Sequence, residues 1–395
     1  MPYGREVYVR GERWLFDPDG RHVEPADPKH YEPCWCWSGK KFKSCHMLRD
    51  QAKPAPISDV IDRWHSRLPA RRCLAPGAPT GCSGKIVDSH VIQRRGGGLE
   101  TIARCGMVYG FKFHPMFFVK KQGVHTPEPV GIGLAGTAPL FCAPHDRELF
   151  RRAETESFSP TARQLLELNF RTVACRLHTN EAVVQQVELL YTGDAGLSRD
   201  EQRKYFIACE AYREESNFYL ENTRALKRCY DAWMTSATDP GVNALVLRLH
   251  GQPDFMCASL TYAIMDFRGN PLPPPEGTTH LCFYTIADGN EVSVVFAWIG
   301  PNAGAEKLCR SLLSLPQTTW ASAVLQYGVE YIDDIYFRPD WWDELLPESR
   351  SALVERLTAH SKPFREHYLD ALVPFGAELS SLRSDRVQVI GSWVP

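Results

Sequence analysis

The chain has 395 residues, of which 44% are hydrophobic and 23% are charged, and its formal net charge is −2. This composition is typical of a soluble globular protein with two or three domains. No run of residues approaches the ~18 apolar positions of a membrane span. No apolar stretch follows the N-terminal charges, so we expect neither a membrane partner nor a secretory signal.

Cysteine usage indicates metal binding. Six of the thirteen cysteines cluster with histidines in the first part of the chain: Cys34, Cys36, Cys45, Cys73, Cys82 and Cys142. In a long chain without a secretory signal, this pattern favours a reducing cytoplasm and metal sites over disulfides. The other seven stand in apolar or helical contexts, where buried free thiols are expected: Cys105, Cys175, Cys209, Cys229, Cys257, Cys282 and Cys309.

The near-neutral charge hides an asymmetry. Residues 61–124 carry eleven Lys and Arg against three Asp and Glu, a local charge of +8, so the rest of the chain carries about −10. A basic segment inside an acidic protein fits a face that binds a polyanion such as nucleic acid. It equally fits a solvated surface balanced by acidic neighbours, and composition does not separate the two.

Along the chain, residues 1–27 predict a short strand-and-turn lead-in, with the turn at residues 17–20. The next segment has two thiols one residue apart, Cys34 and Cys36, then a loop of eight residues, and then a thiol and an imidazole side by side, Cys45 and His46. Four soft ligands within thirteen residues suit a tetrahedral zinc ion, and Gly39 permits the tight turn between them. The predicted ligands are Cys34, Cys36, Cys45 and His46.

This spacing resembles the SEC-C motif, named for the tail of the Sec translocation ATPase. The resemblance covers residues 31–50, inside a zinc knuckle expected over residues 28–52. Trp35 and Trp37 replace the small residues common there, which leaves the ligands intact and adds apolar surface. Because a complete ligand set has no open position for chemistry, we expect a structural zinc and a module that could bind a protein partner.

Residues 53–69 read as a linker and a helix that begins near Ser58. In the following segment, residues 70–158, two pairs of soft ligands stand far apart in sequence. Together they could clamp a second zinc, although ordinary buried thiols are the alternative. The four residues are Cys73, Cys82, Cys142 and His145.

Between these pairs the chain reads Ser89-His90-Val-Ile-Gln-Arg94, and later Leu140-Phe-Cys142-Ala-Pro-His145-Asp146. The arrangement resembles the HNH nuclease module, a ββα-metal fold. The resemblance implies that His90 is a general base for phosphodiester hydrolysis, assisted by a divalent cation such as Mg²⁺. The side chains that would contact phosphates are Arg71, Arg72, Lys85, Arg94 and Arg95.

Two departures from the HNH pattern stand out. The position before the histidine, usually a metal ligand, is Ser89, and Thr137 replaces the family's asparagine. Asp146 could supply a carboxylate instead, with Glu154 as a second, or it could simply favour a helix N-terminus. His90 could likewise be a buried histidine within a zinc-stabilised core. Residues 96–98, three glycines, could admit a phosphate backbone but lack phosphate-loop spacing, so a mobile connector is expected there.

The remainder predicts a helical region and then an α+β domain. Over residues 160–238 helical periodicity covers residues 164–178, 181–190 and 198–234. Over residues 239–395 strands are expected at 244–249, 257–267, 281–286 and 292–298, with a hairpin turn at 288–290, and helices at 304–314, 321–326 and 341–360. The predicted fold class is α+β, with a zinc knuckle, an HNH-like module, a helical segment and a mainly antiparallel C-terminal sheet.

Two functions follow as expectations. The first is a cytoplasmic, zinc-containing HNH-type nuclease that acts on nucleic acid and, by analogy of fold, could serve in defence against foreign DNA. The second is a non-catalytic adaptor in which two zinc modules bind protein or nucleic acid. A weaker third alternative puts the activity in the C-terminal domain, near Asp333 and Trp341. The choice of DNA or RNA and the oligomeric state stay open.

Overall fold

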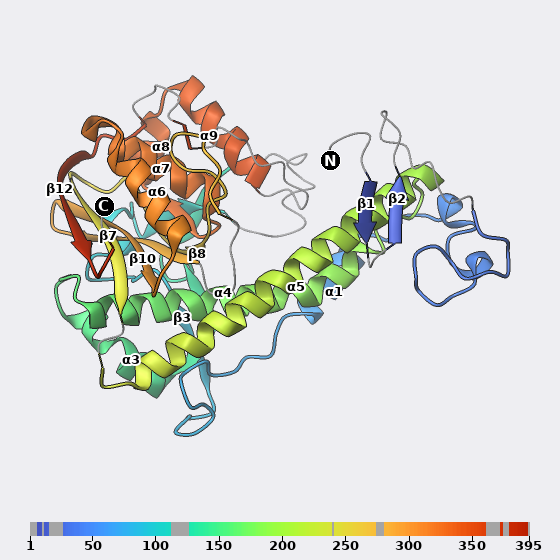
Figure 1. Ribbon diagram of the computed structural model, residues 1–395, viewed down its shortest axis with the longest axis horizontal. Coiled ribbons are helices and arrows are strands. Elements are labelled where there is room, and N and C mark those ends of the chain that lie inside the picture. Colours follow the sequence, from blue (N-terminus) through green and yellow to red (C-terminus); the bar gives the residue numbers. More distant parts are fainter. Residues whose placement is uncertain are drawn as a thin grey trace. The chain divides into compact units, whose positions relative to one another are not determined.

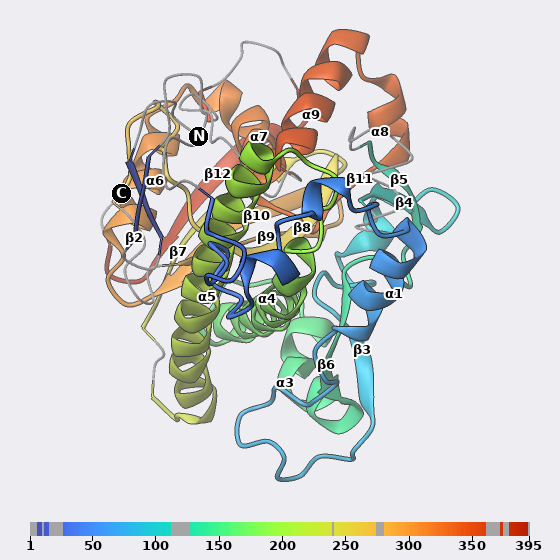
Figure 2. The ribbon, with the colours of Figure 1, turned by 90° about the vertical axis from the view of Figure 1, so that its right-hand side faces the viewer.

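The structure is a computed structural model that describes residues 6–9, 12–15, 27–111, 126–238, 241–273, 280–360, 372–373 and 379–393. The chain forms two compact units (Figures 1 and 2). The first comprises Met1–Pro69 and Asn180–Glu221, and the second comprises Ala70–Thr179 and Asn222–Pro395. Each unit therefore takes a part of two long helices, α4 (Ala162–Leu190) and α5 (Arg199–Thr235).

The first unit begins with an antiparallel hairpin of β1 (Glu6–Val9) and β2 (Glu12–Leu15). The predicted turn at residues 17–20 lies outside the described residues. Two 3₁₀ turns, η1 (Phe42–Ser44) and η2 (Arg49–Gln51), belong to the knuckle. Helix α1 (Ile57–Ser66) follows; its N-cap is Pro56, so it begins one residue before the expected cap.

The two long helices confirm the helical region. Helix α4 runs without a break through residues 178–181, where two helices were expected, because neither glycine nor proline interrupts it there. Helix α5 begins with a capping box: the Ser198 amide donates to the Glu201 carboxylate at 2.9 Å, and the Glu201 amide donates to Ser198 Oγ at 3.4 Å. This reciprocal cap fixes where the helix starts.

The second unit is built on an eight-stranded sheet in which every strand pairing is antiparallel, in the order β12-β7-β10-β9-β8-β11-β4-β5. The strands are β4 (Met107–Gly110), β5 (Glu128–Gly131), β7 (Val242–His250), β8 (Phe255–Thr261), β9 (Leu281–Asp288), β10 (Glu291–Ile299), β11 (Ile335–Phe337) and β12 (Arg383–Ile390). The expected hairpin is confirmed, because Asp288 pairs with Glu291 around a two-residue turn.

The main hydrophobic core lies between this sheet and helices of its C-terminal part. Helices α6 (Ala303–Leu313) and α7 (Trp320–Tyr331) cover one face (Figure 1). On the sheet side the core contains Phe283, Phe296 and Trp298, all nearly fully buried. The residues before Thr179 in α4 contribute on the other face, where the Cys282 thiol reaches the Asn169 carbonyl at 3.8 Å.

The α+β fold with a mainly antiparallel sheet is thus confirmed. The expected helix over residues 341–360 is instead two helices, α8 (Pro339–Glu344) and α9 (Pro347–His360). Pro347 explains the break, because proline lacks the amide that would continue the first helix and is favourable at the start of the next. Among the described helices, none combines the length and the hydropathy that a membrane span needs.

A small ββα unit stands within residues 70–158. It consists of β3 (Ile86–His90), its antiparallel partner β6 (Thr137–Cys142), and α3 (Ala143–Thr155), which follows β6 directly (Figure 2). The order of strand, strand and helix is the one that the HNH resemblance implies. Strands β4 and β5, which lie between β3 and β6 in sequence, belong to the eight-stranded sheet instead.

Candidate metal centres

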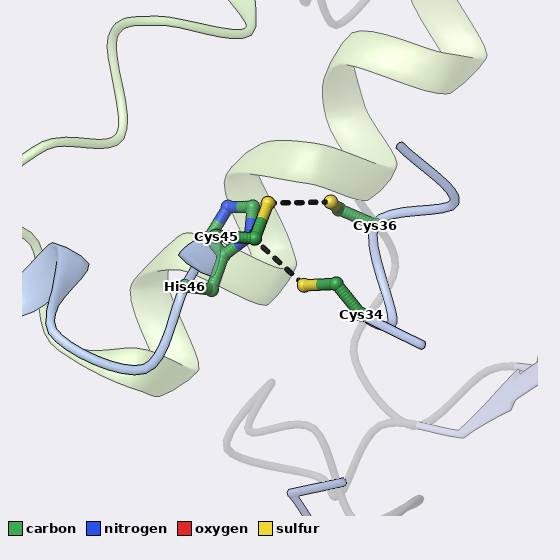
Figure 3. A group of neighbouring side chains, drawn as sticks. All are labelled: Cys34, Cys36, Cys45 and His46. Carbon is green, nitrogen blue, oxygen red and sulfur yellow. Dashed lines mark hydrogen bonds between the residues drawn. The ribbon is translucent and has the colours of Figure 1, made fainter. Parts of the chain in front are cut away.

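The first centre brings together the four side chains of the knuckle. Figure 3 shows Cys34, Cys36, Cys45 and His46 pointing toward one another. His46 Nδ1 lies 3.2 Å from both Cys34 Sγ and Cys45 Sγ, and the sulfurs of Cys36 and Cys45 are 3.4 Å apart. All four ligand atoms lie within 4.8 Å of one another.

This geometry fits zinc. With Zn–S bonds of about 2.3 Å, atoms at the corners of a tetrahedron lie roughly 3.5–3.8 Å apart, and the observed spacings are close to that. Hydrogen bonds from the Cys34 thiol lower the pKa of Cys36 and of Cys45. Lower pKa values favour the thiolate, which is the form that binds metal.

Backbone geometry of the knuckle follows from its sequence. The Cys34 amide donates to the Lys40 carbonyl at 2.9 Å, which closes the loop that carries Ser38 and Gly39. Gly39 has φ of +72°, a left-handed conformation that glycine adopts without strain. Ser38 Oγ lies 3.3 Å from the sulfurs of both Cys36 and Cys45, so the loop also places a hydroxyl beside the thiols.

The knuckle has a hydrophobic core of its own that includes residues of α5. Trp35 and Trp37 meet Phe206 edge to face, with ring centroids 5.5 and 5.3 Å apart. Cys34 and Phe42 are buried in the same cluster, together with Ile207. The two tryptophans that depart from the common SEC-C pattern therefore fasten the knuckle to a helix.

The second centre brings together Cys73, Cys82, Cys142 and His145, whose ligand atoms also lie within 4.8 Å of one another. His145 Nδ1 is 3.4, 3.6 and 3.3 Å from the sulfurs of Cys73, Cys82 and Cys142. The sulfurs of Cys73 and Cys142 are 3.8 Å apart. The two distant pairs thus meet, in spacings that a tetrahedral zinc ion needs.

The β3–β6 ladder explains this meeting. Ile86, four residues after Cys82, pairs with Cys142, the last residue of β6. The Leu74 amide donates to the Leu140 carbonyl at 2.8 Å, so the chain beside Cys73 runs along the same strand. Burial raises the pKa of Cys142, but nearby backbone amides, that of His145 first, outweigh this and lower it to about 6. The start of α3 therefore favours a thiolate.

His90 is the last residue of β3 and is half-buried. Its Nε2 lies 3.2 Å from the Ile132 carbonyl oxygen. A carbonyl can only accept, so Nε2 carries a proton, and in the neutral imidazole Nδ1 would carry the lone pair. His90 is thus oriented with its basic nitrogen pointing away from Ile132.

The carboxylates of the ββα unit, the predicted Asp146 and Glu154 and also Asp88, differ in their partners. Asp146 stands in the first turn of α3, and its Oδ1 is buried without a hydrogen-bond partner. Asp88 pairs with Arg71 at 2.5 Å, and Glu154 pairs with Arg171 at 2.5 Å. The groups of three or more His, Cys, Asp and Glu ligands found among the described residues are the two centres above, and neither includes His90 or Asp146.

The five basic residues expected to contact phosphates are all exposed: Arg71, Arg72, Lys85, Arg94 and Arg95. Two of them have acidic partners, Asp88 for Arg71 and Glu100 for Arg95, the latter at 3.2 Å. Residues 112–125, the end of the basic segment, lie outside the described residues.

Two features of the structure were not predicted from the sequence. Asp194, in the connection between α4 and α5, accepts from His46, although 148 residues separate them and no local pattern marks it. The glycines at 96–98 are not a free connector, because the Ala287 amide donates to the Gly97 carbonyl. Of the seven cysteines expected to be buried, five are, whereas Cys105 and Cys229 are exposed.

Comparison with protein families confirms the knuckle. Residues 32–48 match the family model described as the SEC-C motif. Searches of curated proteins and of solved structures give no significant match. The chain therefore contains a SEC-C motif with a Cys/His cluster that fits zinc, while the HNH resemblance of residues 70–158 stays a prediction.

Proposed function

We propose that this protein binds nucleic acid and hydrolyses its phosphodiester bonds with the ββα unit of β3, β6 and α3. The observation that carries the proposal is the setting of His90. It ends the first strand of a ββα unit whose helix begins at a Cys/His centre, and its Nε2 is engaged by the Ile132 carbonyl. An imidazole held in this tautomer has its basic nitrogen ready to accept a proton.

In the proposed reaction, His90 Nδ1 removes a proton from a water molecule as the water oxygen bonds to phosphorus. The ester P–O bond breaks, the leaving oxygen takes a proton from solvent water, and His90 returns its added proton to solvent. General-base catalysis of this kind typically contributes a factor of about 10²–10⁴ to a rate. Zinc at the second centre has four protein ligands, so its proposed role is to hold β6 and the start of α3 together.

Exposed basic side chains support nucleic acid as the substrate. Lys85 and Arg94 flank the strand that ends in His90, and both are exposed. Contacts of this kind position a phosphate backbone without reading its sequence. The proposal therefore includes no preference for a base sequence, nor for DNA over RNA.

A divalent cation such as Mg²⁺ would stabilise negative charge on the phosphate when bound. Asp146 is the residue that best suits it, because its Oδ1 is buried without a partner. One carboxylate falls short of the several oxygen ligands that such a cation takes. The Mg²⁺ prediction thus rests on Asp146, and the proposed proton transfer to His90 does not require the cation.

The test is cleavage of supercoiled plasmid, single-stranded DNA and single-stranded RNA by the full-length protein, with Mg²⁺, with Mn²⁺ and with EDTA. We expect cleavage that His90→Ala lowers at least 100-fold. His30→Ala is the matched control, since His30 is exposed and belongs to the other unit. Zinc content and circular dichroism establish that each variant is folded. Absence of cleavage by the parent, or cleavage that survives His90→Ala, would refute the nuclease.

One observation favours a second function, a non-catalytic adaptor. Asp88, two residues before His90, and Glu154, the second carboxylate expected beside Asp146, are held by Arg71 and Arg171. With Asp146 as the remaining carboxylate, too few for a divalent cation, the unit could bind nucleic acid or a protein without cleaving. Binding of nucleic acid that weakens steeply with salt, together with no cleavage under any of the conditions above, would favour this adaptor over the nuclease.

A further inference from the structure

The imidazole of His46 has two partners. Its Nδ1 faces the thiols of the first centre, and its Nε2 lies 2.8 Å from Asp194 Oδ2. A histidine that binds zinc through Nδ1 is neutral and carries its proton on Nε2. That proton points at a carboxylate, and this fixes both the tautomer and the plane of the ring.

Asp194 is itself held in place. Its side chain is only 4% exposed. The second carboxylate oxygen, Oδ1, accepts hydrogen bonds from Arg49 Nε and Nη2 at 2.9 and 2.7 Å. Arg49 also donates to the Thr192 carbonyl at 3.2 Å, and its own carbonyl accepts from the Gly196 amide at 3.0 Å. Both oxygens of Asp194 are thus engaged, and its position is set from both sides.

The second centre lacks this arrangement. In the part of the chain that the structure describes, the hydrogen bonds of His145 run from Nδ1 to the three thiols. Beside its Nε2 stands Gly81, whose added Cβ would lie 3.5 Å away. The two centres have the same ligand types, yet carboxylate support is given to His46 and not to His145.

We propose that Asp194, clamped by Arg49, is a positioning residue of the first zinc site. It orients His46 through the Nε2 proton and makes the α4–α5 connection part of the metal site. A carboxylate partner raises the basicity of the imidazole and slows its loss from the metal; removing such a partner typically lowers metal affinity about 10–100-fold. Zinc in this knuckle is therefore retained by a residue far outside the motif.

The test uses the full-length protein with both zinc ions bound. Zinc transfer to a coloured chelator is followed in time for the parent and for Asp194→Ala. We expect two phases, of which one becomes about 10–100-fold faster in the variant while the other, from the second centre, is unchanged. Asp50→Ala is the matched control, because Asp50 is exposed and adjacent to Arg49.

Spectroscopy and a conservative variant distinguish the proposed positioning of His46 by Asp194 from a role of Asp194 in packing alone. With Co²⁺ in place of zinc, Asp194→Ala should change the d–d bands of one site, because the imidazole is no longer held. Asp194→Glu keeps both acceptor oxygens and should restore part of the slow release, whereas Asp194→Asn has one acceptor oxygen for the donors of His46 and Arg49 and should release zinc faster than the parent. If Asp194→Ala does not fold, Asp194→Asn and Arg49→Ala carry the test through the same two measurements. Release rates and Co²⁺ spectra equal to those of Asp50→Ala in every folded variant would overturn the proposal.

Discussion

The amide of Ala287 donates a hydrogen bond of 2.8 Å to the carbonyl of Gly97. Strand β9 pairs with β8 only as far as Tyr284. Ala287 lies three residues further along β9, where this edge of the strand is open to another partner. The glycine loop that follows His90 fills that place. The loop, expected from the sequence to be a connector, is a packed joint between the ββα unit and the large sheet.

Substitution of these glycines should destabilise the second unit. A Cβ at Gly97, where φ is +97°, would collide with the Ala287 carbonyl, and one at Gly98 would collide with the Gln93 carbonyl. We expect Gly97→Ala and Gly98→Ala each to lower the free energy of unfolding by more than about 2 kcal/mol. Gly133→Ala is the control, because a Cβ there meets no atom within 4 Å. Urea titrations that give the same midpoint for all three variants would contradict the packed joint.

The zinc content should be two ions per chain after exhaustive dialysis. Cys82→Ala should lower it to one, since it removes a ligand of the second centre alone. Cys105→Ala should leave it at two, because this exposed cysteine belongs to neither centre. Elemental analysis gives the count directly. A value of one in the parent protein would remove zinc from one centre, and the count in Cys82→Ala, zero or one, would tell which centre holds the ion.

Asp334 should make the second unit less stable as pH rises. Burial, followed by the neighbouring Asp333, raises the pKa of Asp334 from 3.8 to about 6. Because the pKa of Asp334 is higher in the folded state, its protonated carboxyl adds to the free energy of unfolding below pH 3.8. This stabilisation is lost as pH rises through 6. Asp334→Asn should therefore stabilise the protein at pH 7.5, by an amount about 1 kcal/mol larger than at pH 5.

Urea titrations at both pH values, with Asp50→Asn as an exposed control, measure this difference. Zinc loss at pH 5 would affect the parent and both variants alike, so the comparison between variants stays valid. A pH-independent difference between Asp334→Asn and the parent would show that the carboxyl titrates near its ordinary value.

Nucleic-acid binding should depend on salt through the basic residues near β3. Each phosphate contact contributes about −0.9 to the slope of log K against log salt concentration on double-stranded DNA. Lys85→Ala and Arg94→Ala should each reduce the magnitude of that slope by about 1 and weaken binding to all sequences alike. Arg383→Ala in β12, also exposed, is the matched control. Fluorescence anisotropy over a range of salt concentrations measures the slopes. Equal slopes in all three variants would place the contacts elsewhere.

The sequence by itself determined the features that depend on neighbouring residues. The first Cys/His cluster, which fits zinc, was predictable because its four side chains fall between Cys34 and His46, close enough for one loop to bring them together. The β9–β10 hairpin was predicted for the same reason, since its turn and both strands are continuous in sequence. Helix α5 was also readable, because capping and periodicity are local properties.

Tertiary structure decided what depends on distant segments. The second centre could be suggested from two weak pairs, but only the β3–β6 ladder brings Cys82 and Cys142 together. Strand β11 is three residues long, too short for a periodic pattern, yet its pairing with β8 and β4 joins β4 and β5 to the sheet. No local sequence pattern marks Asp194 as part of the metal site. Its role arises only because folding buries one carboxylate between His46 and Arg49, where a hydrogen bond is made by proximity in space and not in sequence.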